Sequence, residues 1–491
     1  MQCNECVNLK ARIEELSRQI EWLARQQFGR KSEKTVTKVF PDETGVQADA
    51  SSALQTEGGV KTPRKGHGTT RLPDLVPRLD VFVPVEPSKQ TCPCCARTMK
   101  LVGYSEKRET SVVPQHVRER VFHCEIYRCE FHPDQVVKAK APDRAIDGVA
   151  CDHGTLAHIS HQKLVVSVPI ERQAEQFSNA GTPIAASTLN MWFLKYCMFL
   201  VSVAEAERAY IEKGSLAYSD DTSFRVQDKN KDGVKVHVGN EYLITNGVDA
   251  AYMIYCHGRT DASAKEIIGN FKGVLVADGL KSYKKIDGVQ VAACWAHVRR
   301  YFVEAWRSPD SKTGDARAQK PVELINAIFE IDRRCRQNKT GLEELQRIRD
   351  AEAKPILDEI KGWMSANMPV IPPKSALGKA IAYLDSRWED ACRFLTDARI
   401  PLDNNLSERA LRKTVLGRKN FLFAGSTEAA QAIAKAYGVM ASCSLCKVDP
   451  YQYMVWALDT FANTPIESYD DITPRKYAAF TKGDAGGSAG N

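Results

Sequence analysis

The sequence lacks a long hydrophobic run: no stretch of its 491 residues approaches the roughly 20 consecutive apolar residues that cross a bilayer. The opening residues, MQCNECVNLK, also lack the apolar core of a signal peptide. An extreme charge is missing as well, since 68 Lys and Arg against 61 Asp and Glu leave a net charge of +7. We therefore expect a soluble intracellular protein whose charge permits an anionic partner without requiring one.

Cysteine pairs that would indicate a disulfide scaffold are also missing, because most of the 15 cysteines stand singly. One group differs: Cys92 and Cys95 form a C-x2-C knuckle, and Cys124 and Cys129 follow about 30 residues later. This spacing predicts a structural zinc ribbon, with clustered free thiols as the alternative. Because four residues separate Cys124 from Cys129, His132 is a rival ligand.

The chain before residue 205 is predicted to hold helices and a linker. Apolar residues from Leu9 to Leu23 are spaced alternately by four and three, which is the seam of a coiled coil; an amphipathic helix packed on its own protein fits equally well. Residues 36–80 contain few large apolar residues and a basic patch, so we expect a flexible linker. Residues 153–200 are helical in pattern, and a turn within them predicts either a helix-turn-helix or an ordinary helical hairpin.

From Ser215 onward the apolar pattern changes from helical to strand-like. The predicted strands cover residues 216–226, 234–247, 250–256, 273–278 and 289–294. The first three form an antiparallel meander, and helices at 262–270 and 295–306 alternate with the last two. Three antiparallel strands followed by alternating helix and strand is the order of a ribonuclease-H-like fold.

Acidic residues on this pattern are suited to metal binding. Asp220 and Asp221 lie on the first predicted strand and Asp278 ends the fourth, so carboxylates from neighbouring strands can converge. Such a set is what a pair of Mg²⁺ ions requires, because hard cations take oxygen ligands. A third acid is expected on a later helix, where Glu408 stands. The alternative for Glu408 is the N3 position of a capping box behind Asn405.

Basic residues gather close to these acids in the sequence. The stretch 409–420 contains no acid and holds Arg409, Arg412, Lys413, Arg418 and Lys419. A stripe of this kind is typical of proteins that bind nucleic-acid phosphates. Arg299 and Arg300, on the predicted helix 295–306, bind phosphate or are simply solvated.

Short motifs follow one another along the chain: FGRKSEK (28–34), CPCC (92–95), PIERQ (169–173), DDT (220–222), ADG (277–279), CWAHVRR (294–300), LDNNLSERALR (402–412) and GRKN (417–420). In this order the motifs resemble those of the insertion-sequence-66 family of bacterial transposases, which are DDE enzymes. The resemblance covers most of the chain.

The resemblance implies that Asp220, Asp278 and Glu408 are the catalytic acids and that they bind two Mg²⁺ or Mn²⁺ ions. The family's Asp-Glu-Thr is Asp-Asp-Thr here, so Asp221 is a rival to Asp220. It implies a DNA transposase that cleaves DNA at element ends and transfers the 3′-hydroxyl into target DNA. A catalytically inactive DNA-binding regulator and a structure-selective nuclease on the same fold are the alternatives.

The partners and location that follow are double-stranded DNA, a second copy of the chain, companion proteins from the same element, no membrane, and the nucleoid of the bacterial cytoplasm. The expected fold class is a multidomain α+β and α/β protein. Its expected parts are a coiled-coil helix (1–35), a basic linker (36–80), a zinc-ribbon-like module (81–150), a helical DNA-binding region (151–205), a ribonuclease-H-like core (206–310 and 401–445), a helical insertion (311–400), and a helical segment with a disordered tail (446–491).

Overall fold

The computed structural model describes residues 120–128, 136–139, 142–230, 233–307 and 314–487. A two-stranded antiparallel sheet pairs β1 (Ile126–Arg128) with β2 (Val136–Lys138). A second, larger sheet and the helices around it make up the remainder of the described chain.

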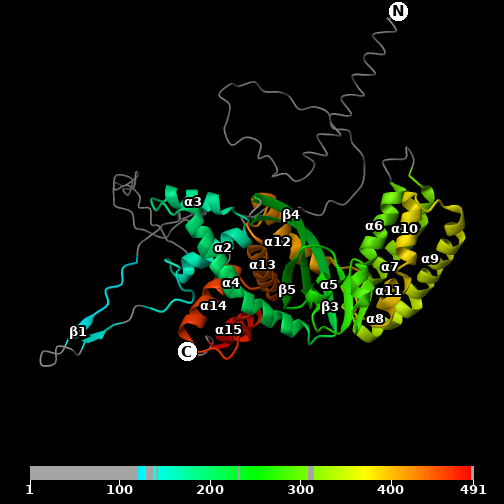
Figure 1. The fold of residues 1–491 in the computed structure, drawn as a ribbon. Coiled ribbons are helices and arrows are strands. Elements are labelled where there is room, and N and C mark those ends of the chain that lie inside the picture. Colours follow the sequence, from blue (N-terminus) through cyan, green and yellow to red (C-terminus); the bar gives the residue numbers. More distant parts are fainter. Residues whose placement is uncertain (1–119, 129–135, 140–141, 231–232, 308–313, 488–491) are drawn as a thin grey trace, which may run out of the picture. The chain divides into compact units, whose positions relative to one another are not determined.

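The fold is built around a five-stranded mixed sheet (Figure 1). Its strands are β3 (Leu216–Asn230), β4 (Gly233–Thr245), β5 (Ala251–Cys256), β6 (Gly273–Ala277) and β7 (Val289–Ala293), in the spatial order β5-β4-β3-β6-β7. The first three are antiparallel neighbours, whereas β6 runs parallel to β3 and β7 parallel to β6. The predicted meander and the two later strands are confirmed. The hairpin of β3 and β4 is longer than predicted, since their pairing continues to Asn230 and Gly233.

Strand β6 packs against a hydrophobic cluster on each face, as its continuous apolar run predicts. Leu275 and Ala277 of β6 belong to one hydrophobic cluster, and Val276 between them belongs to a second. The alternation follows from the two-residue period of a strand. The central strands therefore have fixed positions, and polar side chains at their ends are held in place.

Helices from both ends of the described chain, together with α5 from between β5 and β6, pack in the first cluster. They are α2 (His153–Leu164), α3 (Ile170–Asn179), α4 (Ala186–Ile211), α5 (Asp261–Ile268), α12 (Asn405–Phe421), α13 (Thr427–Cys446), α14 (Pro450–Asn463) and α15 (Pro474–Gly487). Both α4 and α13 contact β5, and α12 contacts β3. The predicted helices at 262–270 and 295–306 are confirmed within a few residues at their ends, whereas the helical region predicted at 153–200 consists of α2, α3 and α4 and continues to Ile211.

Further helices form the second cluster with the other face of β6 and β7. They are α6 (Trp295–Trp306), α7 (Gln319–Gln337), α8 (Leu342–Ile348), α9 (Lys354–Asn367), α10 (Ala376–Asp385) and α11 (Trp388–Cys392). Short 3₁₀ turns lie at Lys281–Lys285, Ala316–Ala318, Met368–Val370, Arg393–Leu395 and Tyr469–Ile472, and a π-turn at Arg349–Ala353. Helix α6 packs against α7 and α10, and α11 contacts β7, which joins this helical group to the sheet.

Helix α4 is long and apolar enough to cross a membrane by length and composition, and it alone passes that test within the described residues. This differs from the expectation that no stretch approaches such a span. Its side chains Leu189, Tyr196 and Leu200 are fully buried in the first cluster. The burial is the packing of a core helix, whose apolar residues cover a sheet.

One buried acid on the sheet is unusual. Glu241 of β4 lies opposite Thr222 of β3 and is fully buried. Neither of its carboxylate oxygens has a hydrogen-bond partner among the described residues. Burial raises the pKa of Glu241 from 4.5 to about 8, and the charge of Arg418 lowers it less. Between pH 4.5 and about 8 the folded protein therefore keeps a proton on Glu241 that the unfolded chain releases.

We expect Glu241→Gln to make stability less dependent on pH. Because the folded-state pKa is raised, the wild type loses stability as pH rises from 4.5 toward 8. The variant should gain about 2 to 3 kcal/mol over wild type between pH 5.5 and 7.5, at about 1.36 kcal/mol per pH unit. Urea unfolding at each pH measures the difference. Glu175→Gln, at an exposed glutamate, is the control; a constant difference between wild type and Glu241→Gln would contradict the expectation.

Candidate catalytic site

Three aspartates meet where the parallel pairing of β3 with β6 ends. Asp220 and Asp221 follow Ser219 on β3, and Asp278 follows Ala277, the last residue of β6. The register pairs Ser219 with Ala277, so the next residues on the two strands are adjacent. Carboxylate oxygens of the three aspartates lie within 4.8 Å of one another, and all three residues are half-buried. The structure thus brings together the acids that the sequence placed on separate strands.

Like charges at this distance change the protonation of Asp220. Burial and the Asp278 carboxylate raise the pKa of Asp220 to about 7, with smaller contributions from Asp221 and Glu408. The backbone N–H of Asp221 donates to Asp220 Oδ1 at 2.9 Å and opposes this rise. A divalent cation between Asp220 and Asp278 would replace repulsion with attraction. The oxygen-only donor set fits Mg²⁺ or Mn²⁺.

Asp221 has a different environment from Asp220. Arg259 donates to it twice, from Nη2 to Oδ1 at 2.7 Å and from Nε to Oδ2 at 2.9 Å. Asn240 Nδ2 also donates to Asp221 Oδ2 at 2.6 Å. Both carboxylate oxygens of Asp221 are therefore engaged by protein donors.

Glu408 lies beside the three aspartates but outside their close group. Helix α12 begins at Asn405 behind Asn404, so Glu408 is the fourth helical residue and the capping-box alternative is wrong. Its Oε1 is 3.9 Å from Nε2 of His297 on α6. Burial and Arg300 lower the pKa of His297, whereas Asp278 and Glu408 oppose that change. His297 thus lies near both Asp278 and Glu408.

Asn404 fixes the start of the helix that carries Glu408. Its side chain is fully buried and donates from Nδ2 to the carbonyl of Ser219 at 2.9 Å. Its backbone N–H donates to Sγ of Cys294 at 3.3 Å. These bonds join α12 to β3 and to the residue before α6. Sequence reasoning missed Asn404; a signal was there, because an asparagine immediately before a helix is a common cap.

The helical group between α6 and α12 contacts the loop that carries Asp278. The hydroxyl of Tyr383 on α10 donates to the carbonyl of Asp278 at 2.7 Å, and Arg387 Nη2 donates to the carbonyl of Gly279 at 2.8 Å. The Tyr383 ring packs on Tyr301 of α6 with centroids 4.3 Å apart. Sequence reasoning missed both donors, which stand in no recognisable motif.

Removing the Tyr383 hydroxyl should loosen the Asp278 loop. We expect Tyr383→Phe to destabilise the protein by about 1 kcal/mol, the usual net value of one hydrogen bond. Tyr301→Phe, which keeps the ring contact, is the matched control in thermal melts and urea unfolding. Equal stability of Tyr383→Phe and wild type would contradict a role for this contact.

Comparisons with known proteins give the family of the chain. A family model described as Transposase IS66 family matches residues 148–432, which include all four acids and Arg259. The chain belongs to the IS66 family of transposases. A second model, described as Transposase C of IS166 homeodomain, matches residues 15–81.

Two curated proteins of Sinorhizobium fredii are similar to this transposase over nearly its whole length. It is 26% identical to the uncharacterized protein y4jD, over 96% of this chain and 98% of that protein. It is 25% identical to the uncharacterized protein y4hP, over 94% of this chain and 88% of that protein. These similarities cover almost the full chain and add no activity.

The basic residues of the transposase separate into two groups. The exposed ones are Arg300, Arg409, Arg412 and Lys419. The others face the fold: Arg299 Nε donates to Asn326 Oδ1 at 2.6 Å, and Arg418 donates to Thr222 Oγ1 at 2.6 Å and to the carbonyl of Ser223. Burial lowers the pKa of Lys413. The exposed group is therefore better placed for DNA phosphates than Arg299, Lys413 and Arg418.

The remaining predicted modules are reached only in part by the described residues. Cys92, Cys95, Cys129 and His132 lie outside them, as do the coiled coil and the linker, while Cys124 lies within them and is exposed. The zinc ribbon stays a prediction. Helices α3 and α4 pack against each other, which fits a helix-turn-helix and a helical hairpin alike.

Proposed function

We propose that this transposase cleaves DNA at element ends and transfers the 3′-hydroxyl into target DNA, using Asp220, Asp278 and Glu408 on a ribonuclease-H-like core. The observation that carries the proposal is the pair of neighbouring carboxylates, Asp220 within β3 and Asp278 directly after β6, at the point where the parallel pairing of the two strands ends. The exposed basic residues next to Glu408 support a DNA substrate.

Divalent ions bound here would polarise the scissile phosphate and lower the pKa of the attacking hydroxyl. In the proposal the chain's residues do the rest. Asp220 and Asp278 would hold the ions, and Glu408 would add the third carboxylate from α12. Arg409, the residue after Glu408, and Arg412, one turn after Glu408, would bind phosphates and orient the strand. In-line attack by water on the phosphate at the element end would break its P–O3′ bond and release a 3′-hydroxyl. In-line attack by that hydroxyl on a target phosphate would displace the target strand's 3′-oxygen, and both steps would use one site.

The proposal extends to the assembly. Pairing of two DNA ends requires more than one active site, and the predicted coiled coil at 1–35 would join two copies. The Cys92 and Cys124 groups would bind zinc and, with α3 and α4, contact the element ends. Companion proteins of the same element remain part of the proposal.

A strand-transfer assay tests the function. Full-length protein is incubated with Mg²⁺, labelled duplexes carrying the element ends, and a target plasmid. We expect cleavage that exposes a 3′-hydroxyl at the end and products in which that strand is joined to the plasmid. Unrelated duplexes are the control. Cleavage without joining or end preference would favour a nuclease, and specific binding without cleavage would favour a DNA-binding regulator.

A further inference from the structure

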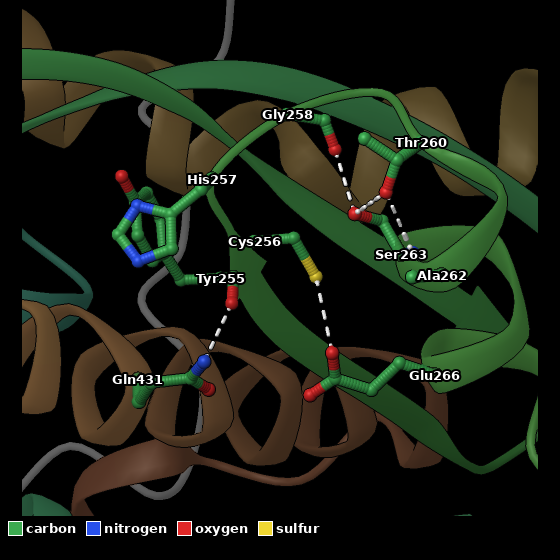
Figure 2. A pocket seen from close by; sticks show the side chains of 9 residues that line it. All are labelled: Tyr255, Cys256, His257, Gly258, Thr260, Ala262, Ser263, Glu266 and Gln431. Atoms are coloured by element: carbon green, nitrogen blue, oxygen red, sulfur yellow. Dashed lines mark hydrogen bonds between the residues drawn. The ribbon is translucent and has the colours of Figure 1, made fainter.

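A short loop between β5 and α5 brings Arg259 to the acids. The carbonyl of Gly258 accepts from the hydroxyl of Ser263 at 2.7 Å and from the hydroxyl of Tyr242 at 3.2 Å. Thr260 caps α5 by accepting from the N–H of Ser263 at 3.1 Å. Figure 2 shows Gly258, Thr260 and Ser263 joined by these bonds on one side of a cavity of about 320 Å³. The residues on both sides of Arg259 are therefore fixed.

The guanidinium of Arg259 lies between two of the three aspartates. It forms the bidentate contact with Asp221 and approaches Asp278 Oδ2 to 3.8 Å. The Asp221 side chain is only 3% exposed, and Asn240 supplies its third donor. The described hydrogen bonds leave Asp220 with a single protein donor, the N–H of Asp221. Protein donors thus engage both carboxylate oxygens of Asp221 but only one carboxylate oxygen of Asp220.

We infer that Arg259 is a positioning residue: with Asn240 it keeps Asp221 out of the metal shell and leaves Asp220 and Asp278 as the paired ligands. The inference rests on the proposed function and decides between Asp220 and Asp221 as the first catalytic acid. A buried carboxylate without its partner is strongly unfavourable, so Asp221 without Arg259 would turn to the nearest cation. A metal held by Asp221 would be displaced from the position that Asp278 and Glu408 share.

Two variants of the full chain separate the roles of the residues. Arg259→Met frees Asp221, so Mn²⁺ binding without DNA should stay as tight as wild type or tighten, while DNA cleavage falls at least tenfold. The double variant Arg259→Met with Asp221→Asn removes the whole ion pair and leaves the net charge unchanged. It should bind Mn²⁺ within threefold of wild type and recover at least half of the lost cleavage on a logarithmic scale. Calorimetry measures binding, and thermal melts check folding.

The possible results are distinguishable. Loss of Mn²⁺ binding in the double variant would identify Asp221 as a ligand and overturn the inference. So would wild-type cleavage by Arg259→Met, or a double variant that cleaves no faster than the single one. Arg259→Lys, which keeps the charge and loses the fork, should lie between wild type and Arg259→Met. Mn²⁺ binding by the wild type that Asp278→Asn does not weaken would overturn the proposed metal site itself.

Discussion

Replacing Asp278 with Asn is expected to lower the rate of Mg²⁺-dependent strand cleavage by at least about 10³-fold, which corresponds to roughly 4 kcal/mol of transition-state stabilisation. Asp278 faces Asp220 across two parallel strands, and both carboxylates lie within the group of oxygens no more than 4.8 Å apart. The amide keeps the volume of the side chain and removes the charge that would bind the cation. Folding should be little affected, because the substitution relieves repulsion with Asp220.

Single-turnover cleavage of an end-bearing duplex measures this loss. Asp287→Asn is the matched control, since it makes the same change at an exposed position between β6 and β7. DNA binding in the presence of Ca²⁺ should be the same for wild type, Asp278→Asn and Asp287→Asn to within about threefold, because phosphate contacts supply most of that affinity. Retention of full cleavage by Asp278→Asn would contradict the assignment of the site.

Local patterns explain which parts of the fold could be predicted. The strands β3 to β7 were predicted because alternating or continuous apolar runs report burial directly. The same argument places Asp220, on the first predicted strand, near Asp278, at the end of the fourth, because carboxylates from neighbouring strands can converge. The length of the β3–β4 hairpin was underestimated, because polar residues around the turn continue the ladder to Asn230 and Gly233.

Contacts between distant parts of the chain could not be predicted from the sequence. Tyr383 and Arg387 donate to the carbonyls of Asp278 and Gly279 across 105 and 108 residues. A backbone carbonyl carries no sequence signal, so nothing marked these donors. Arg259 is a similar case: it is a single arginine after a strand, and only the fold shows that it donates to Asp221.

Helical periodicity alone could have separated exposed basic residues after Glu408 from one that faces the sheet. Three exposed basic residues lie on one face of α12: Arg412 is three residues after Arg409, and Lys419 is ten residues after Arg409. Arg418 falls on another face and bonds to Thr222 of β3. A period of 3.6 residues separates these positions without any structure. Treating the stripe as one group concealed the distinction.

A buried ion pair in the helical group gives the largest expected effect on stability. Arg349 is 1% exposed and holds Asp332 through two bonds, Nε to Oδ1 at 3.0 Å and Nη2 to Oδ2 at 2.7 Å. Its Nη1 donates to the carbonyls of Phe394 and Ile400 at 2.9 and 3.0 Å. The segment fixed by these carbonyls leads directly to Asn404 and so to the start of α12.

Arg349→Met is therefore expected to destabilise the protein by about 3 to 5 kcal/mol, because it leaves the Asp332 carboxylate and two carbonyls buried without their donor. Urea unfolding measures the loss. Arg334→Met is the matched control: Arg334 pairs with Glu352 on the surface, and its removal should cost less than about 1 kcal/mol. Similar losses for both arginines would contradict the distinction between buried and exposed pairs.

The double variant Arg349→Met with Asp332→Leu separates the two parts of that effect. Replacing a buried ion pair by apolar residues of similar size is often close to neutral, so stability should recover by about 2 kcal/mol or more relative to Arg349→Met. We also expect Arg349→Met to lower DNA cleavage, and the double variant should not recover it, because neither side chain then donates to the Phe394 and Ile400 carbonyls that fix the approach to α12. A double variant that regains wild-type cleavage would place the whole effect of Arg349 in stability and none in the position of Glu408.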